Sequence, residues 1–121
     1  MTGVMAVLAG SGGKTLKVTA SNVSGSASGF AASGSVNTIG SSTNTTASGG
    51  TSPYTYAWTF VSQTSGNTPS ISNSAAQNPY WTVVAVDGTP SESTWRVTVT
   101  DSASNTATYN ILVSLEWVDI R

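Results

Sequence analysis

The chain has 121 residues, a net charge of -1 and a hydrophobic content of 38%, but only 7% of its residues are charged, against about 25% in an average soluble domain. This length and hydrophobicity fit one domain with one core. The few basic residues form no extended patch, which excludes nucleic acid and an anionic membrane surface as expected partners. A surface this close to neutrality associates readily, so the composition suits a subunit of an assembly as well as an ordinary extracellular domain.

The absence of His and Cys removes the usual general base, the thiol nucleophile and the common ligands of transition metals. It also removes disulfides, so neither an oxidising nor a reducing compartment is implied. We therefore expect no catalytic residue, no metal site and no cofactor, and predict that the protein is not an enzyme. The opening segment has an apolar run without a basic region before it, so a signal peptide is not favoured, and the run is too short to cross a bilayer.

Residues 1–34 are predicted to form an N-terminal arm with short strands. Apolar residues alternate along two short segments, at Val4, Ala6 and Leu8 and then at Leu16 and Val18. The surrounding sequence is rich in Ser, Gly and Ala and offers too few large apolar groups for a core of its own. The arm is therefore expected to lie along its own sandwich or along a neighbouring subunit, with disorder of residues 20–34 as the alternative.

The strand pattern becomes clearer after residue 35. An edge strand is expected at 36–39 and a second strand at 43–47. A turn rich in Gly and Pro follows at 49–53 and leads into a strand at 54–61. In that strand Tyr, Trp and Phe alternate with smaller residues, which is the period of two that a strand with one buried face requires.

Four further strands are expected in the second half of the chain, at 69–72, 80–86, 94–101 and 106–115. Seven short strands at this spacing favour an all-β fold, an antiparallel β-sandwich over residues 35–115. Its core is expected to come from the aromatic strand and from the strand that begins at residue 94. The predicted core residues are Tyr56, Trp58, Phe60, Trp95, Val97 and Val99.

Two segments, PYTYAW at 53–58 and WRVTVTDSASNTATYNILV at 95–113, resemble the immunoglobulin-like and PKD-like domains of bacterial surface proteins and of structural proteins of tailed bacteriophages. Trp58 stands where that family keeps a buried tryptophan on its third strand, and Trp95 and Val97 stand where antibody domains have the corner tyrosine and the second cysteine. The chain departs from the pattern by lacking both cysteines. The resemblance covers residues 36–115 and implies an immunoglobulin-like β-sandwich rather than an activity, because such sandwiches have many unrelated roles.

The acidic residues do not form a predicted catalytic pair. Asp87 and Glu92 precede the strand that begins at residue 94 and Asp101 lies at its far end, so they are expected at opposite ends of the sandwich. Asp101 is predicted to cap the hairpin that leads to Thr106, with a weak calcium site as the alternative. The segment AGSGGKT at 9–15 lacks the first glycine of a phosphate-binding loop and no helical pattern follows it, so nucleotide binding is not expected.

Residues 116–121 are predicted to form a C-terminal docking tail. Trp, Val and Ile occur there among charged residues, whereas domain ends are usually polar and frayed, and Trp is enriched at the centres of interfaces. We expect the tail to dock on a partner or on the N-terminal arm, with simple extension of the last strand as the alternative. The candidate partner-binding residues of arm and tail are Val4, Leu8, Leu16, Val18, Trp117, Val118 and Ile120.

Two functions of different classes follow from these observations. The resemblance implies a non-enzymatic virion structural protein on the capsid surface, a decoration or cement subunit that binds the major capsid protein, other virion subunits or a second copy of itself; a tail or neck component is a near variant. The alternative is a carbohydrate- or cell-surface-binding module in which Tyr80, Trp81 or Tyr109 stacks on sugars. Sheet packing is the favoured explanation for these three aromatic residues, because half of the positions in an alternating strand face inward.

Overall fold

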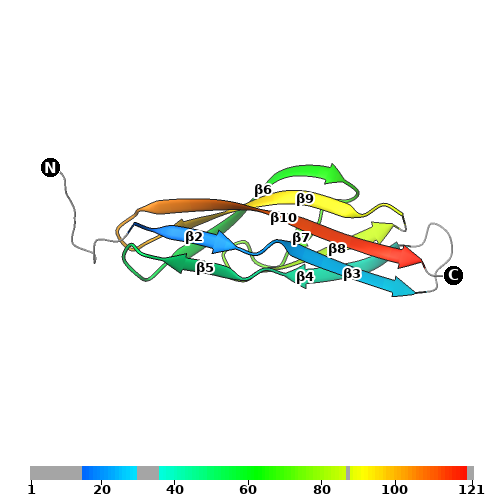
Figure 1. Ribbon diagram of the computed structural model, residues 1–121, viewed down its shortest axis with the longest axis horizontal. Coiled ribbons are helices and arrows are strands. Elements are labelled where there is room, and N and C mark those ends of the chain that lie inside the picture. Colours follow the sequence, from blue (N-terminus) through cyan, green and yellow to red (C-terminus); the bar gives the residue numbers. More distant parts are fainter. Residues whose placement is uncertain (1–14, 30–35, 87, 120–121) are drawn as a thin grey trace.

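The computed structural model describes residues 15–29, 36–86 and 88–119, and every regular element in these ranges is a β-strand. The strands are β2 (Lys17–Ala20), β3 (Val23–Gly29), β4 (Val36–Ser42), β5 (Thr45–Ser48), β6 (Thr55–Ser65), β7 (Ser70–Ile71), β8 (Tyr80–Val86), β9 (Ser91–Thr100) and β10 (Thr106–Asp119). They run along the long axis of an elongated molecule (Figure 1). Each of the seven segments predicted beyond residue 35 overlaps one strand, although several strands extend beyond the predicted bounds. Because β2 and β3 are additional, the described chain has nine strands rather than seven.

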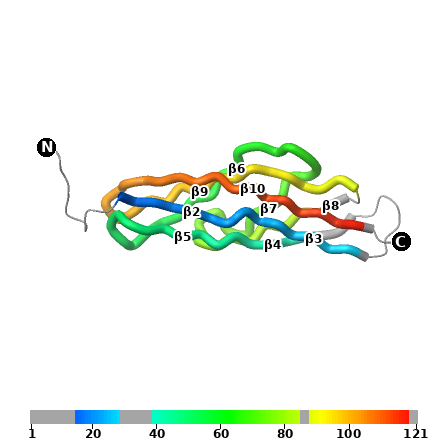
Figure 2. The backbone as a smooth tube through the Cα atoms, viewed as in Figure 1, coloured from blue at the N-terminus to red at the C-terminus, as the bar shows by residue number. Residues whose placement is uncertain are grey.

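The strands form two layers. One layer is a single sheet with the strand order β3-β10-β9-β6, and the other contains the pair β2-β5 and the three-stranded sheet β4-β8-β7. All paired neighbours are antiparallel except β3 and β10, which run parallel from Val23 opposite Val113 to Gly29 opposite Asp119. Figure 2 shows β2 and β3 following one another along the molecule; β2 lies beside β5, and β3 lies beside β4.

The chain passes from one layer to the other between β2 and β3. The backbone N–H of Ser21 donates to the carbonyl of Asn44 at 3.0 Å, and the hydroxyl of Thr43 donates to the carbonyl of Ser21 at 2.5 Å. On the other side, the Asn22 side-chain oxygen accepts a hydrogen bond from the Leu112 backbone N–H at 3.0 Å. These bonds satisfy polar groups at a point that no sheet ladder covers. The described part of the predicted arm therefore lies along its own chain.

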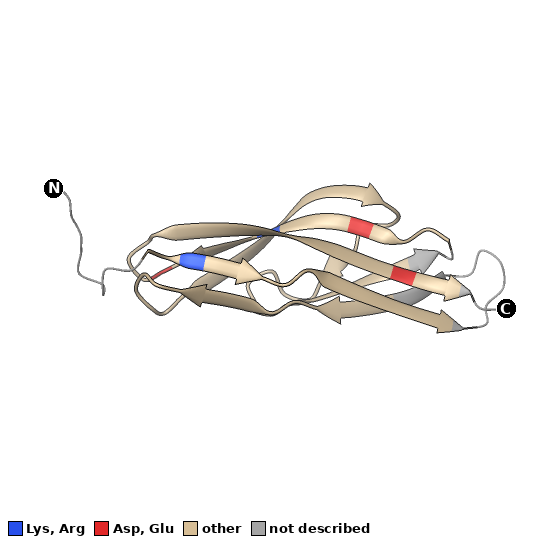
Figure 3. Ribbon diagram, in the orientation of Figure 1, with Lys and Arg blue, Asp and Glu red and all other residues tan. Residues whose placement is uncertain are grey.

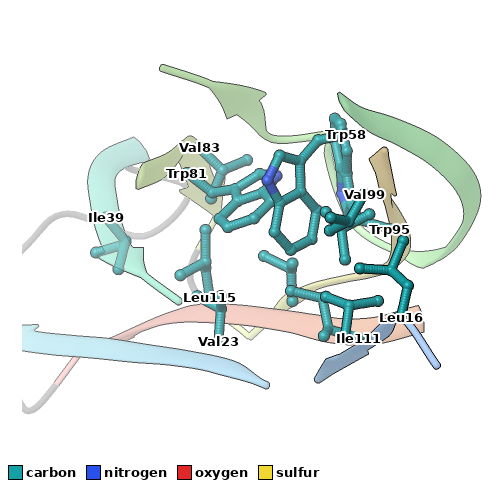
Figure 4. Close-up of a cluster of buried hydrophobic side chains, with 13 residues drawn as sticks. Leu16, Val23, Ile39, Trp58, Trp81, Val83, Trp95, Val99, Ile111 and Leu115 are labelled. Atoms are coloured by element: carbon teal, nitrogen blue, oxygen red, sulfur yellow. The ribbon is translucent and has the colours of Figure 1, made fainter. Parts of the chain in front are cut away.

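The hydrophobic core lies between the two layers, and both contribute to it (Figure 4). Its buried members are Leu16, Val18, Val23, Ile39, Trp58, Trp81, Val83, Trp95, Val97, Val99, Ile111, Val113 and Leu115. Trp81 is fully buried, and its ring meets Trp58 and Trp95 edge to face, with ring centroids 5.1 Å and 5.7 Å apart. This is a favoured geometry for aromatic pairs. The Trp58 indole N–H donates to the Ala76 carbonyl at 3.0 Å, so burial leaves this polar group satisfied.

Most, but not all, of the predicted core residues are buried. Trp58, Trp95, Val97 and Val99 are buried, and Tyr56 is partly buried against the edge of the core. The prediction for Phe60 was wrong, because its side chain is 46% exposed. The β6–β9 register shifts between Phe60 and Ser62, and Figure 1 shows this end of β6 bending away from the body of the molecule. Phe60 therefore has the ring of Trp95, in a T-shaped arrangement with centroids 5.5 Å apart, on one side and solvent on the other.

The last strand continues beyond the predicted end of the sandwich. Residues 116–119 belong to β10 and pair in parallel with residues 26–29 of β3. Strand extension, the alternative to a separate tail, therefore describes these four residues, and the extension lies against part of the predicted arm. Residues 120 and 121 lie outside the described chain.

Candidate functional site

The outer face of the four-stranded sheet carries mainly hydroxyl-bearing side chains. Alternate residues of β9 and β10 face outward because the residues between them, such as Val97 and Ile111, are buried. The outward-facing set includes threonines at positions 94, 98, 100, 106 and 108. Leu112 interrupts this polar face and is the most exposed large apolar side chain in the described chain, at 57%.

A hollow of about 240 Å³ lies beside Leu112. Its lining residues are Thr64, Glu92, Ser93, Leu112, Val113 and Ser114. The Thr64 hydroxyl donates to the Glu92 carbonyl at 2.9 Å, which fastens the end of β6 to β9 and forms one wall. The hollow therefore combines one exposed apolar side chain with hydroxyl groups and a carboxylate.

The same face continues along β10 toward its end. Leu112, Ser114, Glu116 and Val118 occupy alternate positions and so point to one side of the strand. Val118 is 42% exposed. Figure 3 shows acidic positions on β9 and β10, and Glu92 and Glu116 both belong to this face. We refer to Thr64, Glu92, Leu112, Ser114, Glu116 and Val118 as the β10 surface.

The predicted partner-binding residues differ in their exposure to solvent. The prediction for Leu16 and Val18 was wrong, because both are buried in the core, 8% and 6% exposed, and cannot reach a partner in the folded chain. The alternation of these two apolar residues indicated a strand whose apolar side is buried in the core of the same chain. Trp117 is partly buried against the core and Val118 is exposed on the β10 surface. Val4, Leu8 and Ile120 lie outside the described residues, as does most of the segment 9–15.

The three aromatic residues considered for sugar stacking also differ. Trp81 is completely buried and is excluded. Tyr109 on β10 is 40% exposed and Tyr80 on β8 is 45% exposed. Tyr80 lies on the outer face of β8, because its neighbour Trp81 points into the core.

Asp101 is a buried carboxylate, 4% exposed. Its two oxygens accept hydrogen bonds from the backbone N–H groups of Thr51 at 2.9 Å, Ala103 at 3.0 Å and Asn105 at 2.8 Å, and from the Asn105 side-chain amide at 3.1 Å. The hydrogen bond from the Asn105 side chain, together with those from the backbone, holds the pKa of Asp101 below its usual value despite burial. The predicted capping role is confirmed. The donors turned toward this carboxylate are N–H groups rather than the oxygens that calcium requires.

The lowered pKa predicts acid sensitivity. Because the Asp101 pKa is lower in the folded than in the unfolded chain, its stabilising contribution is present above the unfolded value and is lost as pH falls through the folded value. We expect the melting temperature to decrease when the pH is lowered below about 4. Asp101→Asn should melt lower than the wild type at neutral pH, and the difference should shrink in acid. Calorimetry across this pH range checks the prediction, and a difference that does not change with pH would contradict it.

The described chain contains no group of three or more acidic, His or Cys side chains placed to hold a metal ion, and no helix long and apolar enough to cross a membrane. A second hollow, of about 390 Å³, is lined by Thr15, Lys17, Ser48 and Gly49.

The comparisons with known proteins concern the fold. No family model matches the chain, and no curated protein matches it. Among solved structures, the chain is similar to part of a nucleoside hydrolase-related hypothetical protein from Saccharophagus degradans that is associated with carbohydrate metabolism. The likeness has a TM-score of 0.50 at 16% sequence identity and covers 88% of this chain but 26% of that one. At this identity it describes a shared strand arrangement and nothing about activity.

Proposed function

We propose that the two layers form an immunoglobulin-like β-sandwich. The strand order supports this assignment. One sheet of an immunoglobulin-like domain has the strand order A-B-E-D, which matches β2, then β5 and β4 together, then β8, then β7. The other sheet has the order G-F-C, which matches β10-β9-β6. In this comparison β4 and β5 are two halves of one strand B, interrupted at residues 43 and 44. Trp58 then lies on strand C and packs in the core, as in the family that the sequence resembles.

We further propose that this sandwich is a non-enzymatic virion structural protein, a capsid decoration or cement subunit that binds neighbouring coat subunits. The resemblance to domains of tailed-bacteriophage structural proteins supports the location on the virion. The low charge supports association, because near-neutral surfaces have little mutual repulsion. A tail or neck subunit would use the same surfaces, and immunogold labelling of virions distinguishes the two positions.

The observation that carries a binding role is the β10 surface. Exposed Leu112 beside a hollow, with hydroxyl groups around it, provides an apolar anchor within a polar rim, which is the usual composition of a protein interface. Val118 is a second exposed apolar residue further along the same face. Because Leu16 and Val18 are buried, we propose the β10 surface in place of that part of the arm as the attachment site.

Capture by capsids tests this proposal. Purified protein is mixed with capsids assembled from the coat protein of the same virus, and the bound fraction is measured after sedimentation. Leu112→Ala should weaken binding about tenfold, which corresponds to about 1.4 kcal/mol. Val84→Ala is the matched control, because Val84 is 46% exposed on the opposite layer. Equal binding by the Leu112 variant, or no binding by the wild type, would contradict the proposal.

A further inference from the structure

Tyr80 lies against the sheet surface. A Cβ atom added at Gly40, on the neighbouring strand β4, would be 2.2 Å from the Tyr80 hydroxyl oxygen and 2.5 Å from two of its ring carbons. The outer half of the ring therefore covers the glycine, and the ring lies along the sheet rather than standing up from it. Since the side chain is 45% exposed, the ring also meets solvent.

The surroundings of Tyr80 are uncharged and rich in hydroxyl groups. Ser42 lies opposite Tyr80 in the β4–β8 register, Thr82 follows on the same face of β8, and Ser70 of β7 lies opposite Thr82. Val84, the next outward residue, is 46% exposed. No residue of β4, β7 or β8 is charged. This face thus presents a flat aromatic ring, an aliphatic side chain and several hydroxyl groups.

Such a face complements a neutral sugar. The face of an aromatic ring is electron-rich and attracts weakly positive groups, such as the C–H bonds on the apolar side of a pyranose, while hydroxyl side chains fix orientation through hydrogen bonds. An ionic ligand would find no opposite charge on these strands.

We propose that the outer face of β4, β8 and β7, centred on Tyr80 over Gly40, binds an uncharged carbohydrate. The site lies on the layer opposite the β10 surface, so it can be occupied while that surface is attached to a partner. The glycine has a specific part in it, because any larger residue at position 40 would displace the ring.

Titration of the isolated, full-length protein tests the site. The probes are linear hexamers of α-1,4-glucose, β-1,4-glucose, β-1,3-glucose and β-1,4-N-acetylglucosamine at millimolar concentration, followed by amide chemical-shift changes in NMR spectra. We expect at least one hexamer to shift the resonances of Gly40 and Thr82. Tyr80→Ala should weaken its binding about tenfold or more, an effect of the size that aromatic contacts contribute.

Two further variants separate a binding role from a structural one. Gly40→Ala keeps the tyrosine and requires only the flexible ring to move, so it should weaken sugar binding while the melting temperature changes little. Tyr109→Ala removes an exposed tyrosine from the opposite layer and should bind as the wild type does. Absence of binding to all four hexamers, or binding that survives Tyr80→Ala, would overturn the proposal. Capsid capture does not depend on this result, so the two proposals fail separately.

Discussion

Replacing Trp58 with alanine is expected to lower the free energy of unfolding by about 3–5 kcal/mol. Trp58 is 3% exposed, packs edge to face on Trp81 and donates its indole N–H to the Ala76 carbonyl. The substitution therefore leaves a cavity, removes an aromatic contact and leaves a carbonyl without its donor. A domain with a typical total stability of about 5–15 kcal/mol would lose much of it. Urea denaturation followed by circular dichroism measures the change.

Phe60→Ala is the matched control for this prediction. Phe60 lies two residues further along β6, on the same side of the strand, but is 46% exposed. Its T-shaped contact with the ring of Trp95 is the main interaction to be lost, so we expect a cost of about 1 kcal/mol or less. A loss at Phe60 as large as that at Trp58 would mean that the core extends under the end of β6, contrary to the structure.

The contrast between these two residues shows what periodicity can and cannot predict. Alternation along 54–61 correctly indicated a strand with one aromatic face, and it placed Trp58 in the core. The alternation gave no information on where the opposite layer ends. The end of that layer decides whether Phe60 is covered or exposed. Whether a side chain on the apolar side of a strand is buried depends on which other strands pack over it, and this is a property of the tertiary structure.

Trp81 illustrates the same limit in the opposite direction. Its segment, YWTVVAV, is apolar on both sides, so the sequence predicted a strand at 80–86 without indicating which face is inside. In the structure Trp81 joins Trp58 and Trp95 at the centre of the core, and Tyr80 is left outside. Both the central core residue and the candidate sugar platform follow from that one choice of face.

Strand β3 had almost no signal in the sequence. Its residues, VSGSASG, include two glycines and three serines, which are poor strand formers. The strand exists because the last part of β10 provides a parallel partner, and because the small residue Gly25 permits close approach: a Cβ there would be 2.9 Å from Leu115 and 3.1 Å from Ser41. Val23 is the one large apolar residue of this strand, and a single residue gives no pattern to read.

Val23→Asp tests whether this strand is an integral part of the fold. Val23 is 1% exposed and pairs with Val113, which is fully buried, so a carboxylate at position 23 would be enclosed without a partner. Uncompensated buried charges cost about 3–5 kcal/mol, and we expect the variant to be largely unfolded at neutral pH. Because the protonated acid is easier to bury, the loss of stability relative to the wild type should shrink in acid.

The adjacent substitution Ser24→Asp provides the control. Ser24 is exposed on the outer face of β3, so the same charge one residue later remains hydrated and should change the free energy of unfolding by about 0.5 kcal/mol or less. Chemical denaturation of both variants decides the matter. If residues 15–29 served only to fasten the molecule to a neighbour, Val23→Asp would leave the isolated chain as stable as Ser24→Asp does. A large difference between the two would instead mean that the strand stabilises the chain to which it belongs.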